Sequence, residues 1–510
     1  MLASILSCAL VGIEGWIVEV EVDISNGLPS FSLVGLPDIA VKESKERVYS
    51  AIKNNGFQYP MKHITVNLAP ADLKKEGPAY DLPIAIGILS ASGQIHSDHL
   101  EDTAFLGELS LNGDIRPIDG VLSMSIELKK KGIKNLILPE ENALEASLVK
   151  GINILPAKHL LQAVNHLANK EIISPLSSNI DNYFSKNIDY DIDLNEVKGQ
   201  ENVKRALEIA AAGAHNLIMI GPPGSGKTML AQRLPTILPT MTIEESLQVT
   251  KVYSIAGLLP DSTPLVTNRP FRAPHHTISS ISLVGGGRIP KPGEISLAHL
   301  GVLFLDELPE FQKNALEVLR QPLEEKKVTI SRVSATLSYP ANFMLIASMN
   351  PCPCGYYGDE NRECSCTDRQ IHNYLNKVSG PLLDRIDIHT EVKATKYDHL
   401  KGNKKGESSA EIRERVNQAR EIQLERYKGK RILFNSHLSP RDIQKYCHLG
   451  KEENSLMESA FNNLKLSARA YHKILKLART IADLDKKNNI NIYHLSEAIQ
   501  YRNLDRKFWS

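Results

Sequence analysis

The stretch HNLIMIGPPGSGKT, residues 215–228, constrains the fold more than any other segment of the chain. Its apolar part predicts a short buried strand, and the loop after it fits G-x-x-x-x-G-K-[ST] at every fixed position. Such a loop turns its backbone N–H groups around phosphates, at the start of a helix whose dipole favours negative charge. The sequence therefore predicts an ATP and Mg²⁺ site in an α/β domain. The phosphate-binding residues would be Gly221, Pro222, Pro223, Gly224, Ser225, Gly226, Lys227 and Thr228, with Lys227 reaching the β/γ-phosphates and Thr228 holding Mg²⁺.

A second apolar run, GVLFLDEL at residues 301–308, ends in two carboxylates. It is typical of a buried parallel strand, and open α/β sheets hold their ligands at the carboxyl ends of such strands. We therefore expect Asp306 to bind Mg²⁺. Glu307 would be the base that orients the attacking water, because phosphoryl transfer depends mainly on positioning and charge stabilisation.

Two further segments follow in order. LIASMNP, residues 345–351, predicts another apolar strand that ends at Asn350, which could reach the γ-phosphate or the water. GPLLDRID, residues 380–387, places Arg385 after a short turn. Arg385 could form a surface salt bridge with Asp384 or Asp387, or it could be an arginine finger for a neighbouring subunit's nucleotide.

The order of these motifs, followed by a helical tail that contains SARAYHKIL, resembles an AAA+ ATPase, which works as a ring. Four longer segments resemble the magnesium-chelatase-like branch and, within it, the ComM/YifB family over the whole chain. These segments are FRAPHHTIS (271–279), KPGEISLAHLGVLFLDELPEF (291–311), NPCPCGYYGD (350–359) and SGPLLDRID (379–387).

The resemblance implies an ATP-driven homo-hexameric helicase that moves on single-stranded and branched DNA. It would promote branch migration of recombination intermediates in natural transformation, with recombination proteins as further partners. The resemblance also favours the arginine-finger role for Arg385. It implies that Arg469 is a second sensor of the γ-phosphate, where the alternative is an ordinary surface arginine.

Charge and composition limit the other classes of function. The formal net charge of the 510-residue chain is +1, so any contact with DNA must come from local patches. Six cysteines, four of them clustered, favour a reducing cytoplasm over a disulfide scaffold. No run approaches the roughly 18 apolar residues of a membrane helix, so we expect a soluble protein that does not bind membranes.

Residues 1–172 predict an α/β domain that resembles the proteolytic domain of Lon proteases, through KKEGPAYDL, LNGDIRPIDGVL and GIKNLILPEENA. That family pairs a nucleophilic serine with a lysine. This chain has Ala79 and Leu122 at those positions, so we expect no proteolysis. Lys74 and Lys75 precede the turn and read as solvated loop charges.

The rest of the chain divides by composition. Residues 173–194 predict a linker, 195–395 the AAA+ core with hairpin insertions, 396–410 a second linker and 411–510 a helical lid. At the start of the core, Val197 and Gly199 resemble the segment that holds adenine in AAA+ proteins. Helix capping and packing are the alternative roles for these two residues.

The long segment between the P-loop and the second strand, residues 241–299, contains GGGRIPKPG and the pair His275 and His276. Adjacent histidines diverge on regular elements, so packing or polar contacts are favoured over metal binding. By resemblance this segment carries a hairpin that enters the ring pore, and KKVTISRVSATLSYPA would form a second hairpin. The charges expected near DNA phosphates are Arg288, Lys291 and Arg332.

Cys352, Cys354, Cys364 and Cys366 follow the pattern C-x-C-x₉-C-x-C in one loop. Four thiolates can close a tetrahedral structural Zn²⁺ site, and reduced cysteines packed in a loop are the alternative.

Two classes of function therefore remain open: a DNA-translocating ring ATPase, or a protein-remodelling or magnesium-chelatase-type motor subunit. Stimulation of ATP hydrolysis by DNA would distinguish them.

Overall fold

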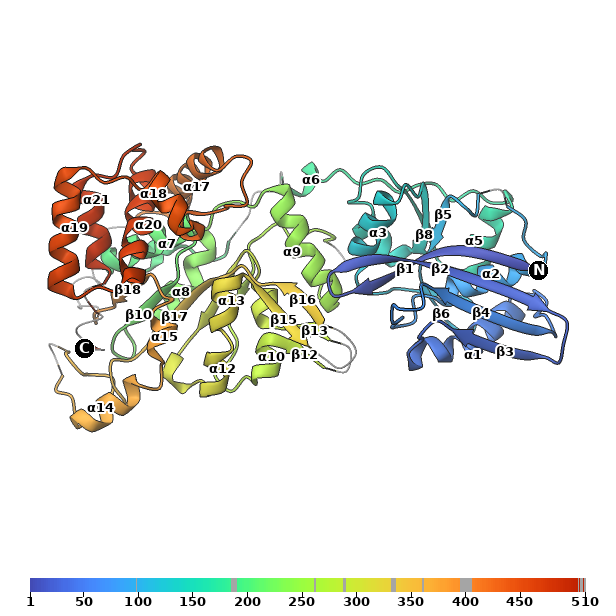
Figure 1. Ribbon diagram of the computed structural model, residues 1–510, viewed down its shortest axis with the longest axis horizontal. Coiled ribbons are helices and arrows are strands. Elements are labelled where there is room, and N and C mark those ends of the chain that lie inside the picture. The colour runs from blue at the N-terminus through green and yellow to red at the C-terminus, as the bar shows by residue number, and fades with distance from the viewer. Residues whose placement is uncertain are drawn as a thin grey trace.

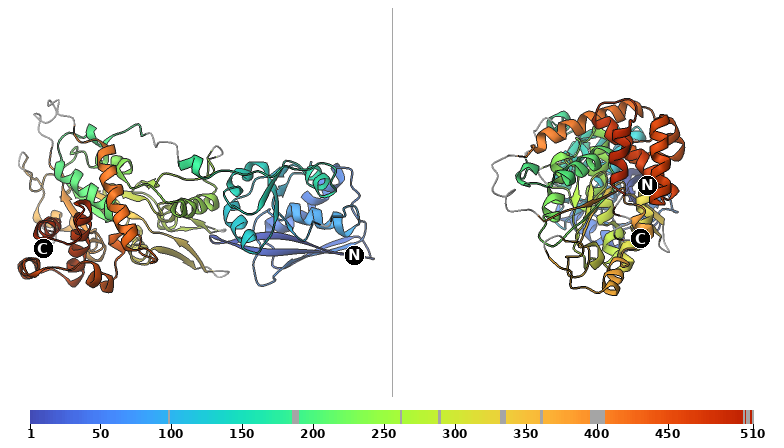
Figure 2. Two further views of the ribbon diagram at one scale, coloured as in Figure 1. Left: turned by 90° about the horizontal axis from the view of Figure 1, so that it is seen from above. Right: turned by 90° about the vertical axis from the view of Figure 1, so that its left-hand side faces the viewer.

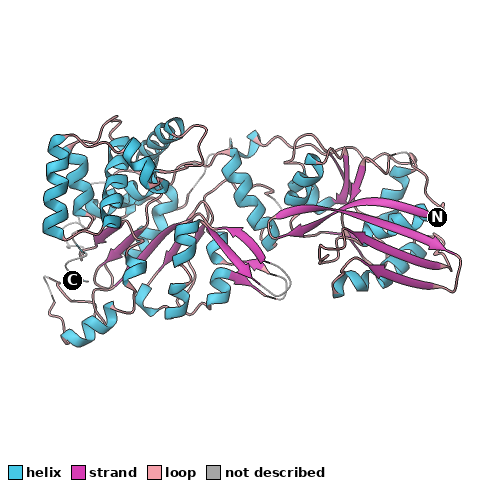
Figure 3. Ribbon diagram, in the orientation of Figure 1, coloured by secondary structure: helices cyan, strands magenta, loops and turns pink. Residues whose placement is uncertain are grey.

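Two sheets of different construction divide the chain, and a group of helices follows them (Figures 1 and 3). The structure, a computed structural model, describes residues 1–97, 99–184, 190–260, 263–287, 290–331, 336–359, 362–394, 406–502, 504 and 508. The first sheet lies at one end of an elongated molecule, and the second sheet and the C-terminal helices occupy the other end. The predicted order of an α/β domain, an α/β core and a helical lid is confirmed.

The N-terminal domain is built on a seven-stranded sheet with both antiparallel and parallel pairs. A long antiparallel hairpin of β1 (Leu2–Val11) and β2 (Glu14–Ser25) is joined on one side to parallel strands. Helix α2 (Asp81–Ala91) is buried almost along its whole length and packs on that hairpin, while α1 (Ile39–Asn54) begins at Asp38, which caps it. The strands, in spatial order, are β3 (Ser30–Val34), β4 (His63–Ala69), β2 (Glu14–Ser25), β1 (Leu2–Val11), β5 (Thr103–Phe105), β8 (Asn135–Pro139) and β9 (Asn153–Ala157).

The positions predicted to correspond to the Lon Ser–Lys pair are both buried. Ala79 is 7% exposed and Leu122 is fully buried in apolar surroundings. The expectation that both neighbouring lysines are solvated was wrong for Lys75, whose side chain is buried and donates to the carbonyl oxygen of Pro70. Burial lowers the pKa of Lys75. Lys74 does lie in solvent, paired with Glu76.

The motor is a five-stranded parallel sheet with the P-loop strand between two neighbours. Alternate side chains of that strand face opposite cores: Leu217 and Met219 pack with the lid side, and Ile218 and Ile220 pack with the hairpin side. Such burial on both faces explains why the strands read as unbroken apolar runs. In spatial order the strands are β11 (Phe271–Arg272), β14 (Val302–Leu305), β17 (Met344–Met349), β10 (Leu217–Ile220) and β18 (Ile388–Glu391).

Both predicted insertions form antiparallel hairpins: β12 (Gly285–Gly286) with β13 (Lys291–Pro292), and β15 (Lys327–Ser331) with β16 (Thr336–Pro340). They extend toward the N-terminal domain (Figure 1). The predicted DNA contacts Arg288 and Arg332 lie outside the described residues.

The N-terminal domain contacts the motor through helix α9 (Ile243–Ala256) and through the hairpins. Glu145, on α4 (Glu140–Ala146), is buried and accepts hydrogen bonds from the Ser254 hydroxyl of α9 and the Leu122 amide of α3 (Val121–Lys130). Its burial raises the pKa of Glu145. The turn between β1 and β2, at Gly12, lies against Leu337 of β16. The two parts therefore share a packed contact, and the view from above in Figure 2 shows them adjoining.

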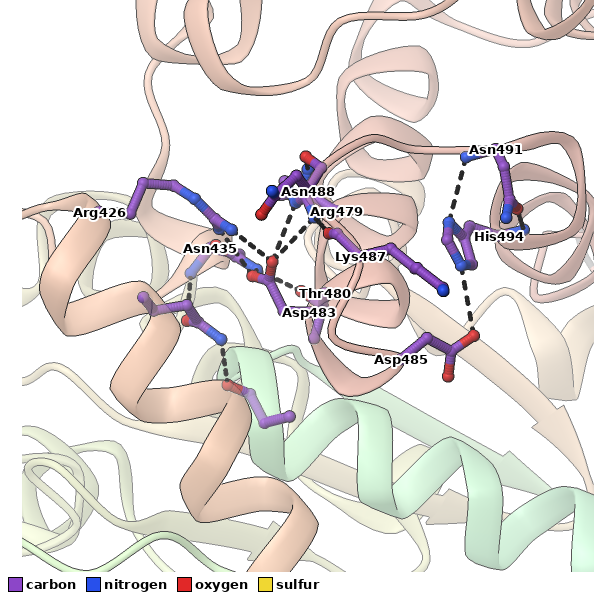
Figure 4. Close-up of polar contacts among 12 residues, drawn as sticks. Arg426, Asn435, Arg479, Thr480, Asp483, Asp485, Lys487, Asn488, Asn491 and His494 are labelled. Carbon is purple, nitrogen blue, oxygen red and sulfur yellow. Dashed lines mark hydrogen bonds and ion pairs between the residues drawn. The ribbon is translucent and has the colours of Figure 1, made fainter.

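One buried carboxylate links several segments of the lid (Figure 4). Asp483 is fully buried and accepts from the guanidinium groups of Arg426 and Arg479 and from the Asn435 amide. This network fixes α20, which presents Arg469 in its first turn, capped by Ser467. The lid helices are α17 (Ser409–Arg426), α18 (Pro440–Tyr446), α19 (Lys451–Leu464), α20 (Ala468–Leu484) and α21 (Ile492–Gln500).

The expected linkers are only partly visible. In the first, residues 181–184 form the short helix α6 (Asp181–Phe184) and residues 185–189 lie outside the described part. In the second, the description resumes at residue 406, and α17 starts at Ser409 rather than at 411. Among the described residues, none of the helices is long and apolar enough to cross a bilayer.

Candidate functional site

The glycine-rich loop joins β10 to α8 (Lys227–Arg233) at the carboxyl edge of the motor sheet. Glycine is required at Gly221 because a Cβ there would lie 2.2 Å from the Val392 carbonyl oxygen of the adjoining segment. Gly226 has φ of 89°, a conformation that side chains disfavour, directly before the helix starts. The loop thus has the backbone shape that a phosphate-binding loop needs.

Lys227 lies under this loop, where its ammonium group donates to the carbonyl oxygens of Gly221 at 2.8 Å and Pro222 at 2.9 Å. A third hydrogen bond, of 3.1 Å, goes to Oδ1 of Asn350. Burial lowers the pKa of Lys227 to about 8, and the nearby carboxylates of Asp306 and Glu307 only partly offset that effect. The structure therefore brings together the predicted lysine and the predicted Asn350.

Asp306 follows directly after β14 and contacts Thr228, the other predicted magnesium ligand. Its Oδ2 accepts a 2.6 Å hydrogen bond from the hydroxyl of Thr228, and its Oδ1 accepts from the hydroxyl of Ser348. A carboxylate next to a threonine hydroxyl is the donor set that P-loop proteins use for Mg²⁺. The residues present fit the ion, and Ser348 would fix the orientation of the carboxylate.

Glu307 follows in a left-handed backbone conformation, with φ of 54°. This conformation is uncommon outside glycine, and the Glu307 side chain is 59% exposed. The carboxylate lies 3.8 Å from Nδ1 of His276, which comes from the loop after β11. A cavity of about 460 Å³ adjoins Glu307 and Asn350, so the predicted base faces an open space.

Arg385 and Arg469 meet in a different cavity, of about 510 Å³, between the motor and the lid. Both form ion pairs with Oε1 of Glu324, at 2.6 Å from Arg385 and 2.7 Å from Arg469. Arg385 is nearly buried, with 12% of its side chain exposed, whereas Arg469 is 55% exposed. Among the described residues, those that line this cavity include none of the P-loop, and none that line the cavity beside Glu307.

The salt bridges considered for Arg385 from the sequence were placed on the wrong partners. Its carboxylate partner is Glu324, more than fifty positions earlier in the chain, instead of Asp384 or Asp387. Asp387 is engaged by Lys473 at 3.1 Å and His215 at 3.4 Å. Although burial opposes ionisation, Lys473 and His215 hold the pKa of Asp387 well below its usual range. Asp387 therefore joins the motor to the lid.

The four clustered cysteines converge as the spacing predicted. Their sulfur atoms all lie within 4.8 Å of one another, and all four thiols are free. Three of the sulfur–sulfur separations are 3.3, 3.5 and 3.6 Å. A tetrahedral zinc site with Zn–S bonds of about 2.3 Å requires separations of about 3.8 Å. The cluster could therefore bind a metal ion.

The cysteine loop also touches the nucleotide loop. Gly355, between the second and third cysteines, lies so close to Pro223 that a Cβ on it would be 2.5 Å from Pro223 Cδ. The loop begins directly after Asn350, and Cys352 is fully buried against the motor core. Its conformation therefore bears on two residues of the ATP site.

The remaining predicted residues occupy varied surroundings. Lys291 donates to Asp119 of the N-terminal domain at 3.0 Å, with both side chains about half exposed. Val197 is buried in the motor core, 6% exposed, and Gly199 has φ of 72° before the helix α7 (Glu201–Gly213). Packing and turn formation are thus the roles visible for these two.

Three residues of the site were missed from the sequence: His276, Ser348 and Glu324. His276 was expected to make packing or polar contacts, without Glu307 as a named partner, and Ser348 reads as part of an apolar strand. Glu324 stands in an ordinary charged helix end. The only signal in the sequence was the position of Ser348, two residues before Asn350 on the same strand face.

Comparisons with known proteins agree with this architecture. The family model described as magnesium chelatase, subunit ChlI, matches residues 193–400. Two related models, subunit ChlI of Mg-chelatase and the ChlI C-terminal region, match residues 20–142 and 406–502.

Two of the relatives match nearly the whole chain, and a third matches a quarter of it. Competence protein ComM of Haemophilus influenzae is 48% identical over 99% of this chain and 98% of its own length. YifB of Salmonella typhimurium is 45% identical over 99% of this chain and 98% of its own length. Lon protease 2 of Bacillus subtilis is 33% identical over 25% of this chain and 22% of its own length. The chain therefore belongs to the ComM/YifB family of magnesium-chelatase-like AAA+ ATPases, and its N-terminal domain is similar to Lon proteases.

Proposed function

We propose that this chain is a homo-hexameric, ATP-driven DNA translocase that promotes branch migration of recombination intermediates. The observation that carries the ring is the separation of Arg385 and Arg469 from the cavity beside Glu307. Two arginines grouped in a cavity of their own would serve the nucleotide of a second copy. The cavity at Glu307 would in turn receive the arginines of another neighbour.

The ATP site divides its roles among residues already in contact. Bound Mg²⁺ would neutralise phosphate charge, held by Thr228 and Asp306. Lys227 would exchange its carbonyl partners for phosphate oxygens while Asn350 stays beside it. Glu307 would orient the attacking water, and His276 would hold the Glu307 carboxylate in position.

DNA as the substrate is supported by family membership and by the name of one relative. Competence protein ComM is named for competence, which we interpret for this chain as natural transformation. The two hairpins and the N-terminal domain would face the DNA, with Lys291 at their junction. Single-stranded and branched DNA are the proposed partners, together with recombination proteins.

We also propose that Cys352, Cys354, Cys364 and Cys366 hold a structural Zn²⁺. Four thiols that converge in one loop match the ligand number and chemistry of such sites. The ion would fix the loop that leads from Asn350 past Pro223.

ATP hydrolysis by the full chain should be measured without DNA, with single-stranded DNA and with a four-way junction, alongside release of labelled strands from the junction. We expect stimulation by both DNA types and junction migration that depends on hydrolysis. Glu307→Gln should retain ATP binding and ring assembly but support neither activity. ATP hydrolysis that DNA leaves unchanged would favour the alternative, a protein-remodelling or magnesium-chelatase-type motor.

A further inference from the structure

We propose that Glu324 is a positioning residue that substitutes for phosphate, holding Arg385 and Arg469 together until the γ-phosphate of a neighbouring subunit's ATP displaces it. This inference rests on the proposed ring, in which both arginines act on a second copy of the chain. It adds a residue that neither the sequence motifs nor the comparisons assign.

The first argument is that both guanidinium groups share a single carboxylate oxygen. Arg385 and Arg469 approach Oε1 of Glu324 at 2.6 and 2.7 Å. One arginine belongs to the turn between α15 (Gly380–Leu383) and β18 in the motor, and the other to the first turn of α20 in the lid. Two like charges held this close repel each other unless an anion lies between them. Glu324 therefore supplies the charge that the arginine pair requires.

The second argument is the excess of positive charge around the pair. The same cavity is lined by four further basic side chains, against the carboxylates of Glu324, Asp384 and Asp387. A terminal phosphate offers more charge and more acceptor oxygens than one carboxylate, so it competes well for such a site. The additional basic residues are Lys326, Arg431, Lys473 and Lys476.

The third argument is an unused donor. Nε of Arg385 is buried and, within the part of the chain that the structure describes, has no hydrogen-bond partner. A buried donor without an acceptor costs free energy, and an additional acceptor at this nitrogen would remove that cost. Nη2 of this guanidinium is paired with Glu324 and Nη1 donates to the carbonyl oxygen of Pro381, so Nε is the donor left for a further acceptor.

Displacement of Glu324 is easy because of where it lies. It is 47% exposed near the end of α13 (Arg320–Glu325), so its carboxylate can turn into solvent without a burial penalty. Glu324 also bridges motor and lid through the two arginines. Exchange of the carboxylate for phosphate would thus replace an internal bridge by one to the neighbouring subunit.

Binding of inorganic tripolyphosphate tests the exchange without a ring. It should be measured by calorimetry on full-length Lys227→Ala, in which the chain's own P-loop is disabled. Adding Glu324→Gln should tighten binding by roughly five-fold, because two partly exposed ion pairs no longer compete. Adding Arg385→Ala instead should abolish it. The matched control is Glu325→Gln, since Glu325 is the exposed neighbour on the same helix.

Turnover separates a positioning role from a structural one. Glu324→Gln in the otherwise native chain should lower KM for ATP while kcat falls, whereas Glu324→Asp should restore both and Glu325→Gln should change neither. Equal tripolyphosphate affinity for Glu324→Gln and Glu325→Gln would overturn the proposal, as would an unchanged KM. Failure of the proposed ring would be a separate result. A mixture of Arg385→Ala and Lys227→Ala subunits would then recover no ATP hydrolysis, whatever the tripolyphosphate measurements show.

Discussion

Nδ1 of His276 lies 3.8 Å from the carboxylate of Glu307, although thirty residues separate them in the chain. His276 also packs edge-on against Phe311, and its ring lies 4.1 Å from that of His275. Glu307 itself has an uncommon positive φ and an exposed side chain. The imidazole therefore lies beside this carboxylate, within ion-pair distance.

His276→Ala should lower kcat by about 10-fold with little change in KM, because the carboxylate of Glu307, which we propose orients the attacking water, loses its neighbouring imidazole. His275→Ala is the matched control, since His275 contacts Thr277 and lies one position away. Steady-state ATP hydrolysis by both variants checks this. Equal activities for the two variants would show that His276 does not position Glu307.

We expect ATP affinity to depend on pH through Lys227. Its pKa is lowered to about 8 by burial, and a bound phosphate would favour its charged form, so binding at higher pH must take up a proton. Affinity should be constant well below that pKa and should fall by up to about tenfold per pH unit above it. Calorimetry between about pH 7 and about pH 9.5 measures this, and Lys227→Arg should lose the dependence because arginine stays charged. A flat profile for the native chain would contradict the prediction.

The strands and the loop around the proposed ATP site were predictable from the sequence because they obey local rules. The strand before Gly221 and the strand before Asp306 are buried on both faces, so they appear as apolar runs that end where polar ligands begin. The glycine positions follow from backbone shape, which a motif records directly. Parallel pairing then brings Asp306 and Asn350 to the same edge as Lys227.

Other parts of the molecule could not be predicted because their partners are distant and chemically ordinary. Glu324 and Glu325 look alike in the sequence, and only the path of α13 gives Glu324 the two arginines. Lys75 reads as a loop charge, yet the chain folds over it. Asp119 and Lys291 belong to different domains, so no periodic pattern connects them.

Arg385→Ala should retain ATP binding at its own P-loop but lose most turnover, by about 10³-fold or more, as expected when an arginine finger is removed. Mixing it with Lys227→Ala should restore part of the activity, because some interfaces then combine an intact P-loop with an intact Arg385. ATPase assays over a series of mixing ratios check this. If mixed rings form but no ratio gives activity, Arg385 acts within its own subunit.

The cysteine cluster should contain one Zn²⁺ per chain after purification without added metal. Replacing Cys352 and Cys364 by serine should remove the ion and raise KM for ATP, since the loop contacts Pro223 and begins beside Asn350. Cys447→Ser is the control, as Cys447 is buried in the lid and far along the chain from the cluster. Metal analysis of reduced protein decides the matter, and a stoichiometry near zero would refute the site.

The ion pair between Lys291 and Asp119 distinguishes two roles for the β12–β13 hairpin. Lys291→Glu should weaken junction migration and leave basal ATP hydrolysis unchanged, either because a DNA contact is lost or because the hairpin is repelled from the N-terminal domain. An exposed pair contributes only about 0.2–1 kcal/mol, so loss of this pair should not unfold the protein.

The double variant Lys291→Glu with Asp119→Lys restores the ion pair with reversed signs. It still has a carboxylate at position 291, where the native lysine would face a phosphate. We expect the double variant to stay defective, because Lys291 is proposed to contact DNA, and its weaker salt dependence of DNA binding should match that of Lys291→Glu alone. Recovery of junction migration in the double variant would instead assign Lys291 to docking of the N-terminal domain and remove it from the DNA path.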